Sequence, residues 1–526
     1  MNLRKSFGLI VLVALFVLPA LGCGLSAQQS DKNTISVLAG SELKDLEPML
    51  GEIQQHTGVR LQFQYIGTLD GAEQILSGTK VDLAWFSHVK YLNLIEGSKS
   101  KVLAQEKIML SPVVLGVKES KAQQWGWVNN PNVTWSDVVA KAKSGELRFA
   151  MTNPASSNSG FSALVGVASA LAGKGDALQK EDVTAISGEL QGFFKGQALT
   201  AGSSGWLADQ YILSQDSLDG MINYESVLLA QNKSGKLHEK LYLVYPKEGI
   251  ITADYPLLLL NADKRAEYDK LVAYLRSPDF QKELMTKTLR RPAIGSQVPL
   301  SSDFPTQLLV EVPFPNSREV VDALLFSYLN EQVKPSHTYY VLDVSGSMEG
   351  DRLKSLVQAM DNLTGADTSL TGQFARFRNR EKVTLIPFSS DVSGVADFMV
   401  DASQPDSLKQ ISDYVHGLQT DGSTAIYSAL QAAYDRARQD RQQEPDRIYS
   451  IVLMSDGENN AGISPEEFKS YYQSTRGLED IRTFTILFGE ADAKTMQSIA
   501  DLTHGRMFDA GKDSLNLVFK EIRGYQ

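Results

Sequence analysis

The first half of the chain alternates short apolar runs with segments whose apolar residues recur at helical spacing. Apolar runs cover 35–39, 59–66 and 80–86, and polar loops or amphipathic stretches separate them. Strand and helix repeated in this order predict a parallel sheet covered by helices. A longer apolar run at 111–117 follows, and we expect it to cross into a second α/β lobe.

The second half shows the same style of pattern, without an internal repeat of the first. Apolar runs at 339–344, 382–388 and 449–454 alternate with amphipathic stretches. The run at 395–400 is expected to be an antiparallel edge strand. The pattern predicts a mostly parallel sheet with helices on both of its faces.

Polar side chains follow the first strand of this second sheet. The strand ends in Asp343, and Ser345 and Ser347 follow at a spacing of two. Open α/β sheets place ligand sites at the carboxyl ends of their strands. A carboxylate with two neutral oxygens suits a hard divalent cation, Mg²⁺ in particular. Two later loops add Thr424, before an amphipathic helix, and Asp456, after another strand.

Together these loops resemble the metal-ion-dependent adhesion site (MIDAS) of the von Willebrand factor A (VWA) family. The family motif takes Asp-x-Ser-x-Ser from the first loop, a Thr from the second and an Asp from the third. The resemblance implies a Rossmann-like VWA α/β sandwich over 337–526 that binds Mg²⁺, or Ca²⁺ or Mn²⁺ in its place. An open coordination position would accept an Asp or Glu carboxylate of a protein partner. The implied metal ligands are Asp343, Ser345, Ser347, Thr424 and Asp456.

A Ser-rich turn in the first half opens an apolar helix. Asn153-Pro154 is followed by Ser156 to Gly160, and a helix N-terminus with free N–H groups suits an anion or a polar ligand. With Tyr224-Glu225 and Tyr242 to Pro246, this turn resembles the type II periplasmic solute-binding proteins over 34–301. The resemblance implies two α/β lobes joined by crossover strands, with a ligand cleft between them.

The candidate cleft residues are hydroxyl-bearing side chains in loops at strand ends. They are Ser41, Thr68, Ser87, Ser157, Ser159 and Tyr224. The alternative is that they act as helix caps and turn residues, which Ser and Thr commonly do. The proposed loops contain neither Lys nor Arg, so neutral donors and helix ends would have to hold an anion.

Residues 302–336 connect the two halves. They include four prolines, but also a helix-like run, Glu319 to Glu331, with an apolar stripe. Such a stripe must be covered, so we expect this helix to dock against one or both domains.

The N-terminus has the pattern of a secretory signal. Arg4 and Lys5 precede an apolar run at 7–18, which is too short for an ordinary transmembrane helix. The following Ala20-Leu21-Gly22-Cys23 resembles a bacterial lipobox, which implies lipidation at Cys23, a signal over 1–23 and a polar tether over 24–33. Ordinary cleavage after Ala27 is the alternative. We therefore expect an exported protein held by a lipid anchor on the periplasmic or surface face of the cell envelope.

Composition narrows the function. A net charge of −11 argues against nucleic acid as a partner, and a single cysteine excludes an intramolecular disulfide. The six histidines are scattered, and the His-Glu-x-x-His, phosphate-loop and Gly-x-Ser-x-Gly patterns are absent, so we expect no enzyme. The prediction is an envelope binding protein whose VWA half grips a protein partner through metal and whose other half binds or senses a small ligand. The alternative is the substrate-binding receptor of an ABC transporter, with the VWA domain as a docking module.

Overall fold

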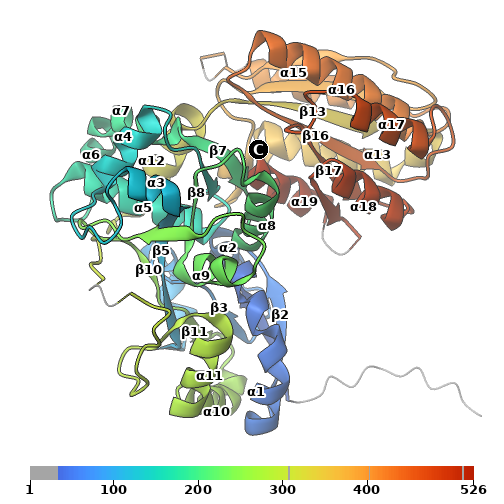
Figure 1. The fold of residues 1–526 in the computed structure, drawn as a ribbon. Helices are drawn as coiled ribbons and strands as arrows, with labels where there is room; N and C mark the ends of the chain where they lie inside the picture. The colour runs from blue at the N-terminus through green and yellow to red at the C-terminus, as the bar shows by residue number, and fades with distance from the viewer. Residues whose placement is uncertain (1–32, 306–308, 402, 405, 512–513) are drawn as a thin grey trace, which may run out of the picture.

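The computed structural model describes residues 33–526, apart from 306–308, 402, 405 and 512–513 (Figure 1). The expected signal, lipidated Cys23 and most of the tether lie outside the described residues. Within them are three sheets, which we assign to a first lobe, a second lobe and a C-terminal domain. Both halves are mixed α/β structures, which confirms the predicted fold class. In the described part of the chain, no helix has both the length and the apolar character needed to cross a membrane.

The first lobe is built on a five-stranded sheet of order β2-β1-β3-β11-β4. Strands β1, β2 and β3 are parallel, whereas β11 returns from later in the chain and runs antiparallel to β3 and β4. Its strands are β1 (Thr34–Ala39), β2 (Arg60–Tyr65), β3 (Leu83–Trp85), β4 (Ala104–Lys107) and β11 (Pro256–Leu259). Its helices are η1 (Ser41–Met49), α1 (Leu50–Thr57), α2 (Thr68–Ser77), α10 (Arg265–Leu275) and α11 (Pro278–Thr288).

The second lobe begins where β5 leaves the first, so the apolar run at 111–117 does cross between lobes. Its sheet has the order β10-β5-β8-β6-β7, and β9 and β12 also pair with β5. The strands are β5 (Met109–Lys118), β6 (Phe149–Thr152), β7 (Gln197–Ala201), β8 (Gly220–Tyr224), β9 (Leu241–Val244), β10 (Thr252–Ala253) and β12 (Arg291–Pro292). The helices are α3 (Glu119–Gln124), α4 (Trp135–Lys143), α5 (Asn158–Ala172), α6 (Lys180–Ala185), α7 (Ser187–Phe194), α8 (Ser204–Ser214) and α9 (Glu225–Lys233).

The connecting segment forms α12 (Arg318–Ser327) and η5 (Tyr328–Gln332). Its apolar stripe is buried in the same core as the second lobe. Tyr328 packs its ring 4.9 Å from that of Phe194 and accepts a hydrogen bond from Gln197 Nε2 at 3.3 Å. The connection therefore packs on the second lobe, and it also contacts the first lobe, where Tyr91 donates to Asp322, and the C-terminal domain, where the rings of Phe326 and Phe374 lie 5.1 Å apart.

The C-terminal domain has a six-stranded sheet of order β15-β14-β13-β16-β17-β18, parallel except for β15. The strands are β13 (Ser336–Asp343), β14 (Lys382–Phe388), β15 (Ala396–Met399), β16 (Ile448–Ser455), β17 (Arg482–Leu487) and β18 (Arg506–Asp509). The helices are η6 (Gly346–Met348), α13 (Asp351–Asp361), η7 (Asn362–Ala366), α14 (Gly372–Ala375), α15 (Asp406–His416), α16 (Ile426–Gln443), α17 (Pro465–Ser474), α18 (Ala493–Leu502), α19 (Leu515–Ile522) and η8 (Arg523–Tyr525).

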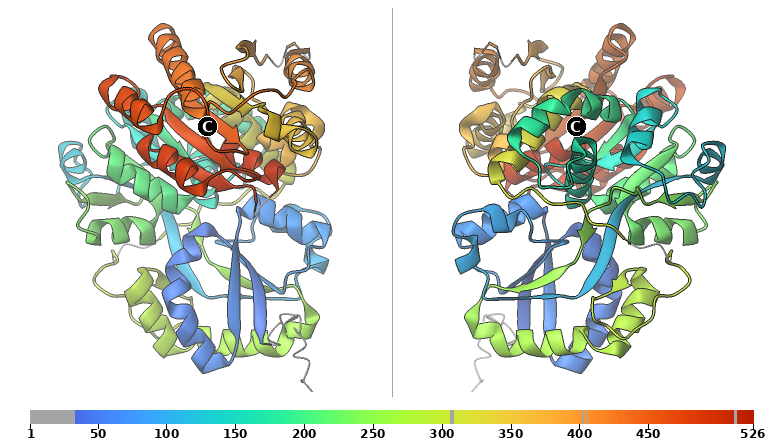
Figure 2. Two further views of the ribbon diagram at one scale, coloured as in Figure 1. Left: turned by 90° about the vertical axis from the view of Figure 1, so that its right-hand side faces the viewer. Right: turned by 90° about the vertical axis from the view of Figure 1, so that its left-hand side faces the viewer.

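Strand β13 lies at the centre of this domain, with all its residues buried. Side chains alternate across a strand, so Tyr340 and Leu342 enter one apolar cluster while Tyr339 and Val341 enter the other. Helices pack on both faces of the sheet, and the domain lies at the end of the molecule opposite α10 and α11 (Figure 2).

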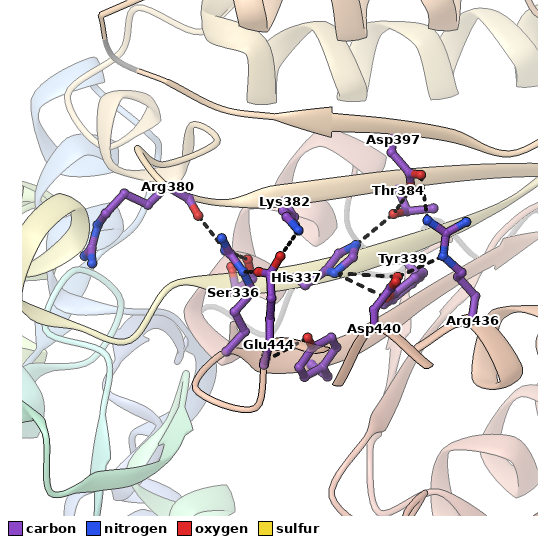
Figure 3. Close-up of polar contacts among 12 residues, drawn as sticks. Ser336, His337, Tyr339, Arg380, Lys382, Thr384, Asp397, Arg436, Asp440 and Glu444 are labelled. Atoms are coloured by element: carbon purple, nitrogen blue, oxygen red, sulfur yellow. Dashed lines mark hydrogen bonds and ion pairs between the residues drawn. The ribbon is translucent and has the colours of Figure 1, made fainter. Parts of the chain in front are cut away.

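His337, at the start of β13, belongs to a closed ring of polar contacts (Figure 3). The other members are Thr384, Asp397, Arg436, Asp440 and Tyr339. His337 Nε2 lies 2.8 Å from Thr384 Oγ1, which donates to Asp397, and Nδ1 lies 3.2 Å from the Tyr339 hydroxyl, which donates to Asp440. Both hydroxyls donate to a carboxylate, so each presents a lone pair to one ring nitrogen, and a neutral imidazole can donate to only one of them.

Burial lowers the pKa of His337 to about 4. The negative charges of Asp440 and Asp397 oppose the shift, while the positive charges of Lys382 and Arg447 add to it. His337 is therefore uncharged in the folded protein at neutral pH.

We expect His337 to make the protein acid-sensitive between about pH 6.5, the ordinary pKa of histidine, and about pH 4. In that window the unfolded chain binds a proton that the folded chain does not. Stability is therefore complete above the window and lost as the pH falls, by about 3 kcal/mol at most. His337→Gln should flatten the free energy of unfolding between pH 6.5 and 4.5, measured by denaturant titration. His416→Gln, at an exposed site, is the control, and equal slopes in wild type and His337→Gln would contradict the assignment.

Candidate metal centre and interlobe cleft

Asp343 is the last residue of β13, and its carboxylate is fully buried. The Ser345 amide donates to Oδ1 at 2.8 Å, and Ser455 Oγ donates to Oδ2 at 2.5 Å. Burial raises the pKa of Asp343, and the nearby charge of Asp456 adds to the shift. Both oxygens of the Asp343 carboxylate thus accept a hydrogen bond. Its negative charge is buried, so a cation beside it would stabilise the ionised form.

The other four residues implied by the VWA resemblance lie around this carboxylate. Ser345 Oγ lies 3.0 Å from Ser347 Oγ, which donates to Asp456 Oδ1 at 2.7 Å. Thr424 comes from the second loop, and a Cβ built on Gly457 would lie 3.6 Å from Thr424 Oγ1 and 3.8 Å from Ser347 Oγ. The structure therefore brings oxygen atoms of all three loops together.

Backbone contacts fix the loops against one another. Gly346 N donates to Gly422 O at 3.1 Å, which joins the first loop to the second. Thr424 N donates to Asn460 Oδ1 at 2.7 Å, and Asn460 N donates back to Thr424 O at 2.9 Å. Asn460 and Ser455 were missed by sequence reasoning because neither belongs to the motif.

Arg352 was missed as well, although it touches the centre most directly. Its guanidinium, from the first turn of α13, pairs with Asp456 Oδ2 and lies 3.3 Å from the Ser347 carbonyl. A second nitrogen lies 3.7 Å from Glu490, which is 88% exposed. The sequence carries only a weak signal for this contact, namely a cation one turn beyond the motif.

The donor set fits a hard divalent cation. Two buried carboxylates and three hydroxyls offer only oxygen, the ligand that Mg²⁺ prefers. Among the described residues, no group of three or more His, Cys, Asp or Glu side chains is placed so that it could hold a metal ion, and this centre has only two carboxylates. Ser347 is exposed at the centre, which leaves that side open to solvent.

A cavity of about 500 Å³ lies between the two lobes, and the C-terminal domain also borders it. Ser41 and Thr68 line it from the first lobe, and Ser157 lines it from the second. Ser87 and Tyr224 are fully buried and do not line the cavity. Both contact the amide nitrogen of Asn158, which does line it.

Ser159 lies away from the cavity lining. Its hydroxyl is fully buried inside the second lobe, 2.8 Å from both Thr152 Oγ1 and Ser204 Oγ. This places it between β6, α5 and α8, a position suited to joining these elements.

Asn158 is a cleft residue that sequence reasoning missed. It is 4% exposed and lines the cavity, and its Oδ1 has no hydrogen-bond partner among the described residues. Nearby, burial raises the pKa of Glu42 although the charge of Arg290 opposes the shift. Glu42 Oε1 accepts a hydrogen bond from Tyr224 at 3.4 Å.

The two-lobed fold with its cleft and the sandwich with its oxygen-rich centre define two classes of binding domain in one chain. Residues 35–287 match the family model of the bacterial extracellular solute-binding protein, and residues 339–521 match that of the von Willebrand factor type A domain. The chain thus contains a bacterial solute-binding domain at 35–287 and a VWA domain at 339–521.

Curated relatives match a smaller part of the chain. Inter-alpha-trypsin inhibitor heavy chain H3 of Homo sapiens is 26% identical over 185 residues, which cover 34% of this chain and 20% of that protein. The Pongo abelii protein of the same name is 25% identical over 202 residues, covering 36% and 22%. The chain thus spans about a fifth of the length of these relatives.

Solved structures of binding proteins are also similar. The periplasmic binding protein AfuA from Actinobacillus pleuropneumoniae is 13% identical, with a TM-score of 0.44, and the match covers 58% of this chain and 99% of that one. The sulfate-binding protein SubI from Mycobacterium tuberculosis H37Rv is 17% identical, with a TM-score of 0.40, covering 55% and 98%.

The Arg352–Asp456 contact gives a prediction for the metal-free protein. Arg352→Ala leaves a buried carboxylate without its cation, so in EDTA we expect a loss of about 3 kcal/mol in the free energy of unfolding. Added Mg²⁺ should recover part of it, because a dication at the centre takes over the compensation. Lys354→Ala, at a 78% exposed position on the same helix, is the control. Equal stability of both variants in EDTA would contradict a structural role for Arg352.

Proposed function

We propose that the chain is a non-enzymatic binding protein of the cell envelope, whose VWA domain binds a protein partner through a divalent metal, most simply Mg²⁺. The observation that carries this proposal is the convergence of five residues at the carboxyl ends of the central strands, on a side that is open to solvent. They are Asp343, Ser345, Ser347, Thr424 and Asp456. When bound, the dication supplies a coordination position for an Asp or Glu carboxylate of the partner.

The charges around the centre favour an acidic partner group. The carboxylates of Asp343 and Asp456 balance a dication, and Arg352 adds one positive charge beside them. Glu490 also lies 3.7 Å from Arg352 but is 88% exposed, so solvent screens its charge; the dication and Arg352 then attract a carboxylate and disfavour a Lys or Arg in its place. This arrangement supports specificity for Asp or Glu over a neutral amide.

We further propose that the solute-binding domain holds a small polar or anionic ligand in the interlobe cavity. Helices α2, α5 and α8 are immediately preceded by Gly67, Ser157 and Ser203, which line the cavity and do not cap their helices through side chains in the described structure. Free amide groups at helix N-termini suit anions. The unpartnered Asn158 Oδ1 adds an acceptor for a ligand hydroxyl or amine.

The exported location is supported by the solute-binding family, and lipid anchoring at Cys23 remains our proposal from the sequence. The alternative function is a transport receptor, in which the cleft delivers its solute to a permease and the VWA domain serves for docking. The match of residues 35–287 to a family of solute-binding proteins supports this alternative. Blocking the cleft should abolish solute uptake if the chain is a transport receptor, but not if it is an adhesion protein.

The metal proposal is tested by capturing partners from envelope extract on the purified chain. Wild type in Mg²⁺ should retain a partner that is lost in EDTA and lost with Asp343→Ala. Asp413→Ala, which removes an acid from the exposed face of α15, should behave as wild type. Mg²⁺ at about 100 times its Kd should also stabilise wild type, but not Asp343→Ala, by about 2.7 kcal/mol. The same partners in all samples would rule out metal-dependent adhesion.

The cleft proposal predicts that filling the cavity blocks the ligand without disturbing the metal centre. Sulfate, phosphate, citrate and neutral sugars at millimolar concentration are compared by thermal denaturation. A compound that raises the Tm of wild type should fail with Ser157→Phe and succeed with Ser100→Phe, an exposed position on the first lobe. Equal stabilisation of both variants would place the ligand outside this cavity.

A further inference from the structure

The C-terminal domain touches both lobes of the solute-binding domain, through two ends of one short segment, Lys520 to Tyr525. Towards the first lobe, Lys520 Nζ lies 3.3 Å from Asp70 Oδ1 and 3.4 Å from Glu73 Oε2, both on α2. Burial alone would lower the pKa of Lys520, but the charges of these two carboxylates outweigh it and raise the pKa. The ammonium is therefore charged and paired at this contact.

A neighbouring loop of the C-terminal domain reinforces this contact with α2. Thr371 Oγ1 donates to Asp70 Oδ1 at 2.7 Å, and the Leu370 amide donates to Glu73 Oε1 at 2.8 Å. Thr371 Oγ1 also lies 2.5 Å from Glu73 Oε2, so Asp70 has two polar contacts with the C-terminal domain and Glu73 has three. The side chains of Lys520, Asp70 and Glu73 are 15%, 31% and 23% exposed, so water and salt reach the edge of the contact.

Towards the second lobe, the contact is aromatic and close. The Tyr525 ring lies 5.0 Å from that of Trp206, and its hydroxyl lies 3.4 Å from Ser203 Oγ. A Cβ on Gly202 would meet the Tyr525 ring at 2.3 Å, and one on Gly524 would meet Ser156 Oγ at 2.6 Å. Glycine at both positions permits this approach to the loops that follow β6 and β7.

The bridging segment is held firmly in its own domain. The Arg523 guanidinium, 2% exposed, pairs with both oxygens of the Glu381 carboxylate at 2.6 Å. A bidentate pair of this kind fixes orientation as well as distance. Movement of one lobe against the other would therefore have to break a contact, because the segment cannot bend to follow it.

The bridging segment, Lys520 to Tyr525, and the neighbouring strand β18 border the interlobe cavity. Arg506 and Lys520 line it from the C-terminal domain, facing the loops of both lobes. Two-lobed binding proteins generally exchange ligand by hinge motion between the lobes. Here the chain crosses between the lobes three times, between β4 and β5, between β10 and β11 and between α11 and β12, and the bridging segment Lys520 to Tyr525 spans the same two lobes elsewhere.

We propose that the docked VWA domain locks the two lobes at one angle and walls the solute cavity, and that the contact of Lys520 and Thr371 with α2 is the latch that opens. The second-lobe contact stays closed, because it is aromatic and the connecting helix α12 is already packed on that lobe. The latch rests on charges at a partly hydrated edge and is the weaker of the two. This inference does not depend on metal binding.

The test measures the distance between the lobes in the full chain. Spin labels are placed on Gln55→Cys in the first lobe and Lys195→Cys in the second, both exposed, in a Cys23→Ser background. Lys520→Glu, which places a third acid against Asp70 and Glu73, should broaden the distance distribution and shift it to longer distances. Amide exchange in α2 should accelerate by about tenfold. Lys354→Glu, the same charge change on exposed α13, should leave both unchanged.

A second experiment leaves Lys520 unchanged and weakens the contact with salt. Raising the salt from about 0.05 M to about 1 M shortens the Debye length and should broaden the same distribution in the labelled chain with Lys520 intact. Unchanged amide exchange in β13 shows that the VWA fold is preserved. An unchanged distribution with Lys520→Glu and with high salt would show that the hinge itself sets the angle. Equal broadening by Lys354→Glu would likewise overturn the latch.

Discussion

The burial of β13 between two parallel neighbours is the constraint on which the proposed metal centre depends. Its register places Asp343 opposite Phe388 of β14 and Leu342 opposite Met454 of β16. A slip by one residue would turn every side chain to the opposite face and would exchange the two apolar clusters. The same register that buries Tyr340 and Leu342 therefore also holds the carboxylate at the edge where the three loops meet.

The sequence predicted what is local and periodic. Strand runs, their polar ends and the alternation with helices follow from side-chain spacing, and so the α/β class of both halves was correct. It also named three loops whose oxygen atoms lie close together in the structure, whereas their binding of a metal stays a prediction. In contrast, the amphipathic stretch between β1 and β2 does not form one continuous α-helix, because Pro48 lies within η1 and the α-helix begins only at Leu50. Proline removes a backbone donor, and a 3₁₀ turn accommodates that loss.

Contacts across long stretches of sequence could not be predicted in this way. Arg352 reaches Asp456 over 104 positions, and Lys520 reaches Glu73 over 447. Neither contact has a periodic signal, because each depends on how packed elements are placed in space. The loops proposed for the cleft contain no Lys or Arg, yet Lys44 of η1 and cations of the VWA domain, including Arg506 and Lys520, border the cavity. The electrostatics of the cleft thus belong to the folded chain as a whole.

The metal centre and the latch lie on different elements that pack against each other. Helix α13 follows the first metal loop, and it contacts α19, which carries Lys520. Tyr340 of β13 also stacks on Phe519 of α19, with ring planes 12° apart. A packed core shifts between discrete arrangements more readily than it deforms continuously. Coupling between partner binding and cleft opening therefore requires two positions of α19 against α13, and the lobe-to-lobe distance measured with and without Mg²⁺ would reveal whether metal selects one of them.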